Sequence, residues 1–385
     1  MPSPDVLDMD ALLAPISAEQ PAGPPLRGGD AELNSLFYAI SDARKEARNS
    51  ERQKSLYEMT QGTANPVPAP KPADWGKVVE LGKQIVATKS KDLWVAAWML
   101  EGLCRTEGYA GLRDAFRLVR QLCEKYWDNI HPRSDTDPTD VSTIVAQLAG
   151  VFDGVLTTPI CDIPVTGSYP RTGADMARRY SISDYRLALQ LDKQADPKQR
   201  RQQVERGAVT MEEFMRAVNA TSAESFRNRL GDIDRCVSEF NDMAKELDNR
   251  CGIHAAPPTS KTREALEDCR NRVSTISKDI LAAADAAAQL ASDAEGQMGS
   301  TPGPGPVPGS FNSREQALQT LLKVADYFRQ HEPHSVVSYS LEQIVRWGRM
   351  SLPELLTELV SDKKSRQEIF RQTGISAKQD DAASD

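Results

Sequence analysis

The sequence predicts an all-α protein with minor extended elements. Apolar residues recur at helical spacings of three and four along most of the 385 residues, and no stretch alternates long enough to indicate a sheet. Charged residues make up 26% of the chain and aromatic residues only 6%, a composition typical of helix-rich soluble domains. Because the chain is longer than one hydrophobic core usually supports, we expect several helical bundles.

Changes in composition and periodicity divide the chain into five expected segments. The firmest boundary is a stretch rich in Gly and Pro, since such a composition cannot bury a core. The segments are an N-terminal helical domain (1–190), a middle helical-hairpin domain (200–295), a linker (296–312), a C-terminal oligomerisation domain (313–374) and a disordered tail (375–385).

The N-terminal segment is expected to form a bundle of helices joined by short connections. A polar helix over residues 31–54 interleaves basic with acidic side chains, which favours a solvated face over a binding patch. Apolar stripes follow from Trp75, after Ser90 as a helix cap, and over residues 112–126 and 141–155. Prolines at 66, 68, 70 and 72 predict an extended loop, and residues between 159 and 185 allow a short extended element.

Two long helices with apolar seams are predicted in the middle segment. The first seam runs from Phe226 to Cys251 and the second from Leu266 to Leu290, with a turn between them. Alternating steps of four and three residues are typical of coiled-coil seams, so the two helices are expected to form an antiparallel hairpin. The apolar seams are too narrow for the two helices to bury them fully against each other, so each needs a further partner helix. That partner is expected either within the chain, at residues 200–220, or in another subunit.

The C-terminal segment is expected to contain three short amphipathic helices. Ser313 with Gln316, and Ser351 with Glu354, have the spacing of helix-capping boxes. A domain of about sixty residues buries a modest fraction of its surface, and these helices carry more apolar side chains than one small core can hide. The candidate oligomer interface therefore comprises Leu318, Leu321, Phe328, Leu341, Ile344, Trp347, Leu352, Leu355, Leu356 and Leu359.

Residue types that carry catalysis or bind phosphate are sparse. The chain has four histidines, and the one close pair, His331 and His334, straddles Pro333, which favours a helix end over a metal site. No glycine-rich phosphate loop of the nucleotide-binding kind is present. We therefore predict no catalytic, cofactor-binding or metal-binding residues.

Three other patterns have ordinary structural interpretations. Asp135 and Asp137 resemble the start of a calcium loop, but Asp140 stands where that loop needs glycine, so a polar loop and a helix cap are expected. Trp94 and Trp98 have the spacing of core residues on one helix face. Reduced, mostly buried thiols are expected for the scattered cysteines, which are Cys104, Cys123, Cys161, Cys236, Cys251 and Cys269.

The charge and the hydropathy pattern limit the partners of the chain. A formal net charge of −8 argues against nucleic acid as the main ligand, because binding phosphates requires a concentrated basic surface. No apolar run approaches the length needed to cross a bilayer, and no leader-like segment precedes the first helix. A cytoplasmic location without membrane insertion is therefore expected.

Short motifs at both ends of the chain occur in an order that points to a known family. In the N-terminal half they are Pro15-Ile16, Pro21-Ala22-Gly23, Arg27, Ser90-Lys91-Asp92-Leu93, Val95-Ala96, Gly108, Gly111-Leu112, Trp127-Asp128, His131-Pro132, Tyr180-Ser181 and Asp184-Tyr185-Arg186. In the C-terminal part they are Ser313-Arg314, Ala317-Leu318, Ala325-Asp326-Tyr327-Phe328, Glu332-Pro333-His334-Ser335 and Trp347-Gly348. Together they resemble the TssA proteins of type VI secretion systems, with their ImpA-type N-terminal domain and, here, a short C-terminal domain. Val336 departs from the pattern, which usually has proline there.

The resemblance implies a non-enzymatic assembly subunit without cofactors. It implies a homo-oligomeric ring built by the C-terminal domain, and contacts with baseplate, inner-tube and sheath proteins and the membrane complex. Two other classes stay open at this point, namely a general cytoplasmic helical adaptor outside secretion and an enzyme with a non-obvious site.

Overall fold

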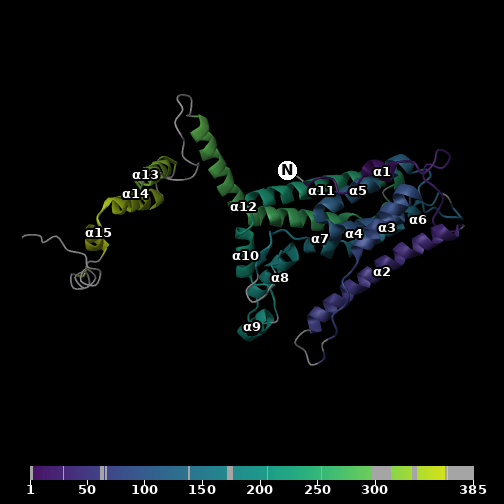
Figure 1. Cartoon of the computed structure of the whole chain (residues 1–385), viewed down its shortest axis with the longest axis horizontal. Coiled ribbons are helices and arrows are strands. Elements are labelled where there is room, and N and C mark those ends of the chain that lie inside the picture. Colours follow the sequence, from purple (N-terminus) through teal and green to yellow (C-terminus); the bar gives the residue numbers. More distant parts are fainter. Residues whose placement is uncertain are drawn as a thin grey trace, which may run out of the picture. The chain divides into compact units, whose positions relative to one another are not determined.

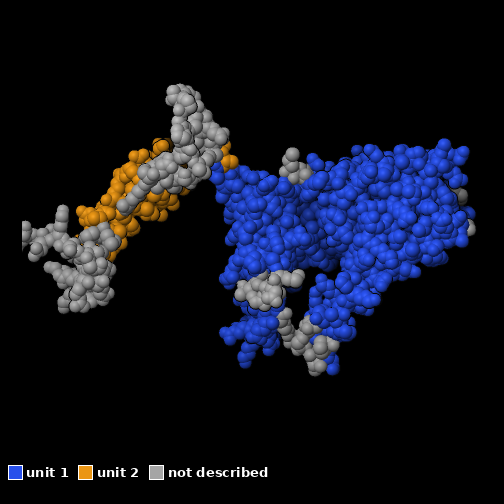
Figure 2. Space-filling model, in the orientation of Figure 1, with its two compact units in different colours: residues 1–287 blue, residues 288–385 orange. Residues whose placement is uncertain are grey.

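The computed structural model describes residues 3–28, 30–60, 65, 67–137, 139–170, 177–205, 207–252, 254–296, 314–331, 336–359 and 362. Helices dominate these residues, and their one sheet is two-stranded (Figure 1). The all-α prediction with minor extended elements is therefore confirmed. The chain divides into two compact units, residues 1–287 and 288–385 (Figure 2).

The first unit contains most of the helices. Its elements up to the sheet are α1 (Met9–Leu13), α2 (Ala31–Thr60), α3 (Trp75–Thr88), α4 (Leu93–Thr106), α5 (Gly108–Tyr126), α6 (Val141–Gly150), a π-helical turn η1 (Val151–Val155) and α7 (Thr157–Asp162). They are followed by β1 (Tyr169–Pro170), β2 (Ala177–Arg178), α8 (Ile182–Asp192), α9 (Pro197–Glu205), α10 (Met211–Asn219), α11 (Ala223–Cys251) and α12 (Ser260–Gly296).

Helix α5 occupies the centre of the first unit. It packs against α4 on one side and along α11 on the other, and α1 also contacts it. Phe116 of α5 lies 5.0 Å from Phe240 of α11, and Phe152 of η1 lies 5.7 Å from Phe240, between ring centroids. All three rings are buried, and edge-to-face pairs of this kind stabilise a core beyond their buried area.

Helices α11 and α12 form the antiparallel hairpin that their seams predict. Ion pairs join Arg270 to Asp234 and Arg227 to Asp285, so later residues of one helix meet earlier residues of the other. The partner of α11 is α5, which neither expected alternative named. Consequently residues of the middle segment share one core with the N-terminal segment. The expected domain limits at residues 190 and 200 therefore stay a prediction, namely that each segment folds when it is produced alone.

Helix α2 is longer than expected and its polar face is only partly solvated. It reaches Thr60 instead of residue 54, and its buried positions end at Ser50. Beyond Glu51, which still bonds to Trp75 and Arg105, α2 extends away from the neighbouring helices (Figure 1). The interpretation of a solvated face is wrong for Arg44 and Arg48, which turn toward buried Glu101 of α4.

The connections show which polar residues begin each helix. Asp92, and not Ser90, caps α4, because its carboxylate accepts from the backbone N–H groups of Trp94 and Val95. Asp140 caps α6 as expected. Residues 67–74 have no regular structure, which fits the proline-rich loop, while Pro66 lies outside the described residues.

The second unit is built from shorter helices. They are α13 (Arg314–His331), α14 (Val336–Arg349) and α15 (Leu352–Leu359), and α13 packs against α14. Gly348 permits this contact, because a Cβ there would approach Leu318 Cδ2 to 2.7 Å. Ser351 begins α15, with Glu354 reaching back to its backbone N–H at 2.8 Å. Ser313, His334, residues 297–312 of the linker and residues 363–385 lie outside the described residues.

Removing the Phe116 ring should test whether the aromatic cluster holds α5 and α11 together. We expect Phe116→Ala to lower the free energy of unfolding of the first unit by about 3–5 kcal/mol, as large-to-small core substitutions do. Leu187, a residue that is 58% exposed, provides the control, and Leu187→Ala should change stability by less than about 0.5 kcal/mol. Urea unfolding followed by circular dichroism measures both. Equal effects would contradict the proposed cluster.

Candidate interaction surfaces and the motif cluster

Several of the family-like motifs meet at one place in the first unit, which we call the motif cluster: Ala22, Gly23, Lys91, Asp92 and His131. The backbone N–H of Lys91 donates to Ala22 O at 2.7 Å, and the N–H of His131 donates to Lys91 O at 3.0 Å. The His131 ring contacts Gly23 O at 2.9 Å through Nε2. Three loops distant in sequence are therefore joined by their main chains.

Gly23 and Lys91 are required by the geometry of the motif cluster. Gly23 has a φ of +71°, and a Cβ there would lie 2.4 Å from Lys89 O. The Lys91 side chain is buried, and its ammonium donates to Leu12 O at 2.8 Å and Val86 O at 2.7 Å. Burial, with a smaller contribution from the charge of Lys125, lowers the pKa of Lys91 to about 8. The motif cluster therefore holds the segment from Leu12 to Gly23 against Lys91 and His131.

A buried ion pair network connects α2 to α4. Glu101 is completely buried, and its two oxygens accept from Arg44 Nε at 2.8 Å and from Arg48 Nε at 2.9 Å. One turn further along α2, Glu51 accepts from Arg105 Nε at 2.6 Å and from the Trp75 indole at 2.7 Å. These contacts hold α2 against α3 and α4 as far as Glu51.

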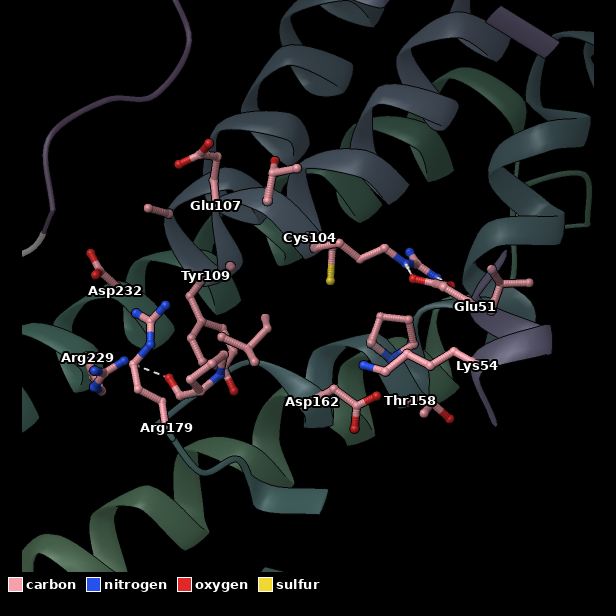
Figure 3. Close-up of a pocket in the computed structure, with 18 of the residues that line it drawn as sticks. Glu51, Lys54, Cys104, Glu107, Tyr109, Thr158, Asp162, Arg179, Arg229 and Asp232 are labelled. Atoms are coloured by element: carbon pink, nitrogen blue, oxygen red, sulfur yellow. Dashed lines mark hydrogen bonds and ion pairs between the residues drawn. The ribbon is translucent and has the colours of Figure 1, made fainter. Parts of the chain in front are cut away.

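A pocket of about 750 Å³ lies beside the projecting end of α2 (Figure 3). Arg179, Arg229 and Asp232 stand at one end, and Lys54 and Asp162 at the other (Figure 3). The described residues that line it include no histidine. Burial raises the pKa of the Cys104 thiol in its wall to about 12 and also raises the pKa of Asp162. The pocket therefore presents charges of both signs and a thiol that stays protonated.

Arg229 anchors the segment that closes this pocket. Its guanidinium donates to Pro164 O at 2.6 Å and to Thr166 O at 3.0 Å. Burial lowers its pKa, and the nearby charge of Arg179 lowers it further. Among the described residues, no group of three His, Cys, Asp or Glu side chains could hold a metal ion. In the same residues, no helix combines the length and apolar character that a membrane span requires.

The expected interface residues of the second unit separate into three sets. Leu318 is buried against Gly348, and the Trp347 indole donates to Glu358 of α15 at 3.1 Å, so both serve contacts inside the unit. Ile344 and Leu359 are exposed. The partly buried remainder is Leu321, Phe328, Leu341, Leu355 and Leu356, while the side chain of Leu352 lies outside the description.

Comparison with known proteins finds the likeness that the sequence motifs indicate. Residues 13–152 match the family described as ImpA, N-terminal, type VI secretion system. Over 377 residues the chain is 26% identical to the type VI secretion system component TssA1 of Pseudomonas aeruginosa, an alignment that covers 95% of this chain and 98% of that protein. The chain is therefore similar to a TssA protein along nearly its whole length. The resemblance seen in the sequence motifs is confirmed.

A solved structure supports the fold. The N-terminal domain of the TssA component from Burkholderia cenocepacia, which includes the conserved ImpA_N region, superposes with a TM-score of 0.56 at 24% identity. The match covers 73% of this chain and 98% of that chain. At this identity the likeness concerns the fold alone.

Sequence reasoning missed the Glu101 network. Glu101 is the one charged residue between Leu93 and Cys104, in an otherwise apolar helix. A lone carboxylate in such a run signals a buried acid that needs a basic partner. The partner could not be identified from spacing, because Arg44 and Arg48 stand more than fifty residues away in the sequence.

The depressed pKa of Lys91 should appear in the pH dependence of stability. Between pH 8 and 10.5, the unfolded chain binds a proton at this lysine that the folded chain does not, so folding stability rises with pH. Relative to a Lys91→Met variant, the wild type should gain as much as about 3 kcal/mol across this window. Urea unfolding at several pH values measures it, with exposed Lys77→Met as control. Parallel curves for wild type and Lys91→Met would disprove the assignment.

The Glu101 network predicts a large effect of a small change. Glu101→Gln removes the negative charge that two partly buried arginines face, and we expect a loss of about 3 kcal/mol in unfolding free energy. Asp42→Asn, which removes an exposed ion pair with Lys45, should cost less than about 0.5 kcal/mol. Urea unfolding gives both values, and hydrogen exchange should show opening of α2 in the first variant only. Unchanged exchange in α2 would refute this role for Glu101.

Proposed function

We propose that this chain is a structural assembly subunit of a type VI secretion system that acts in the cytoplasm without catalysis. In this proposal the second unit joins copies of the chain into a ring. The first unit then contacts baseplate, inner-tube and sheath components during assembly. The ImpA_N match and the similarity to TssA1 over nearly the whole chain support the secretion context.

The observation that carries the ring proposal is the apolar surface of the second unit. Val336 is 75% exposed and Tyr339 64%, and Tyr327 of α13 is 57% exposed. Three helices of 18, 14 and 8 residues form a small core, and small domains often gain stability from oligomerisation. Exposed apolar side chains in such numbers are typical of a protein interface.

The two faces of α14 divide core from interface. Ser338 and Val345, seven residues apart, are buried. Val337, Leu341 and Ile344 follow at steps of four and three, and Val337 and Ile344 are exposed. We assign this second stripe, with Val336 and Tyr339 beside it, to the contact between subunits.

A ring would strengthen the binding of the first units to their partner proteins, even where each single contact is weak. Several first units attached to one ring present their polar surfaces together, so that individually weak contacts with a repetitive structure add up through avidity. The charged pocket beside α2 and the Glu101-anchored helix suit contacts with polar protein surfaces. A closed ring also requires a heterologous interface, in which two different patches meet.

Two other classes receive less support. A general helical adaptor fits the helical fold equally well, but the relative that matches over nearly the whole length is a secretion component. Neighbouring genes for sheath and tube proteins would separate these two. An enzyme needs an activated group, whereas burial keeps the one thiol of the charged pocket protonated.

Charged substitutions on α14 should distinguish interface from core. In the full chain, Tyr339→Asp and Ile344→Asp should each convert a large oligomer into small species while helicity is retained. Val345→Asp, which buries a charge, should instead unfold the second unit. Exposed Lys323→Asp makes the same change to an acidic residue outside the stripe and should leave the oligomer intact.

Light scattering and circular dichroism measure the two properties separately. A wild-type chain that is monomeric and folded at micromolar concentration contradicts the ring. Persistence of the large oligomer in both Tyr339→Asp and Ile344→Asp contradicts the assigned stripe.

A further inference from the structure

Two cysteines from distant parts of the chain meet in the first unit. Cys161 lies near the end of α7 and Cys269 in α12, 108 positions apart in sequence. The Cys269 thiol donates to the Cys161 sulfur across 3.8 Å, and both residues are buried. Among the described cysteines, this is the pair whose sulfur atoms are joined by a hydrogen bond.

An arginine bonds directly to one sulfur of the pair. Arg186 of α8 donates from Nη1 to Cys161 Sγ at 3.2 Å and from Nη2 to Asp268 at 2.6 Å. The side chains of Arg186 and Asp268 are 39% and 34% exposed. Cys161 Sγ is therefore covered by a partly exposed ion pair, and the Arg186 side chain must move aside to admit a small oxidant.

The surroundings of the pair separate it from the other thiols. The hydrogen bond from Cys269 and then the charge of Arg186 lower the pKa of Cys161 to about 7, against the effect of burial. The same hydrogen bond, followed by burial, raises the pKa of Cys269. Burial raises the pKa of Cys104 to about 12 and of Cys251 to about 11. Tyr109 of α5 adds a neutral hydroxyl, which donates to Ile160 O.

We propose that Cys161 and Cys269 form an oxidation-sensitive dithiol, with hydrogen peroxide or an organic hydroperoxide as oxidant, which closes to a disulfide between α7 and α12. Cys161 is the attacking group and Cys269 the resolving group. The first has the positive charge of Arg186 beside its sulfur, and the second has its sulfur 3.8 Å from that sulfur, with Ile160 O as another acceptor for its S–H.

The reaction takes place in two balanced steps. The Cys161 thiolate attacks one peroxide oxygen, the O–O bond breaks, and Cys161 becomes a sulfenic acid while hydroxide leaves, or alkoxide from an organic hydroperoxide. The Cys269 sulfur then attacks the Cys161 sulfur, the S–O bond breaks, and the hydroxyl leaves with the Cys269 proton as water. The pair loses two electrons, and the peroxide gains them.

The bond would change how α7 is held. The sulfur atoms must approach from 3.8 Å to about 2.05 Å, which a helix of six residues between η1 and a loop can follow. α7 contacts α8 and η1, so a covalent tie to α12 makes this corner of the first unit harder to open. The oxidised chain should unfold at a higher temperature than the reduced chain.

The test exposes the full-length reduced chain to submillimolar hydrogen peroxide and analyses non-reduced peptides by mass spectrometry. We expect a peptide pair joined through Cys161 and Cys269 before any other cysteine is modified, and a thermal midpoint that returns to its original value with dithiothreitol. In Cys269→Ser, the sulfenic acid at Cys161 should instead be captured by dimedone.

Matched variants keep the proposal testable if one of them folds poorly. Arg186→Gln removes the charge beside Cys161 and should slow oxidation at neutral pH by on the order of tenfold, since less thiolate is present. Cys123→Ser and Cys251→Ser should not affect the rate. Oxidation of Cys123 or Cys251 as fast as Cys161, or the absence of the Cys161–Cys269 link in oxidised wild type, overturns the proposal.

Discussion

The burial of α5 on nearly every side is the constraint on which the first unit depends. A helix surrounded by other elements must have each polar group matched within the protein, because no water reaches it. Arg113 and Asp114 are buried on α5 and bond to each other. Asp114 also accepts from the backbone N–H groups of Val6 and Leu7, and Arg113 donates to Ser3 O and Pro4 O. The N-terminal segment is therefore needed to complete the core.

The same constraint explains why α11 lies in this core. One face of α5 is closed by α4, and the other remains open until Phe240 and its neighbours on α11 cover it. The seam of α11 was evident from spacing, because periodicity reports which face is buried. It does not report the partner, since residues 112–126 and 226–251 have compatible stripes but stand a hundred residues apart. Which two helices pack together depends on the volume and shape of their side chains, and a pattern of apolar positions does not encode these.

Short-range features were more predictable than long-range polar ones. Asp140 and Ser351 begin helices where their residue types indicate, because a cap depends on two or three neighbouring positions. Ser90 was mistaken for the cap of α4, although Asp92 two residues later offers the stronger acceptor and stands next to the first turn. Arg44 and Arg48 looked solvated because nearby acids could pair with them, yet buried Glu101 is the partner whose desolvation cost they offset.

The family-like motifs describe how the chain folds, which is why they indicated a likeness to the TssA proteins without revealing a reaction. Gly23 makes room for Lys89 O, and Lys91 satisfies two carbonyl groups, so their chemistry is used inside the protein. In the second unit, Leu318 and Ile344 look alike in sequence, but Leu318 is buried beside Gly348 while Ile344 is exposed. Apolar residue type alone cannot separate the core of a small unit from its interface with another copy. The difference depends on which face of α14 meets α13, and the buried Ser338 and Val345, with Gly348 against Leu318, mark that face.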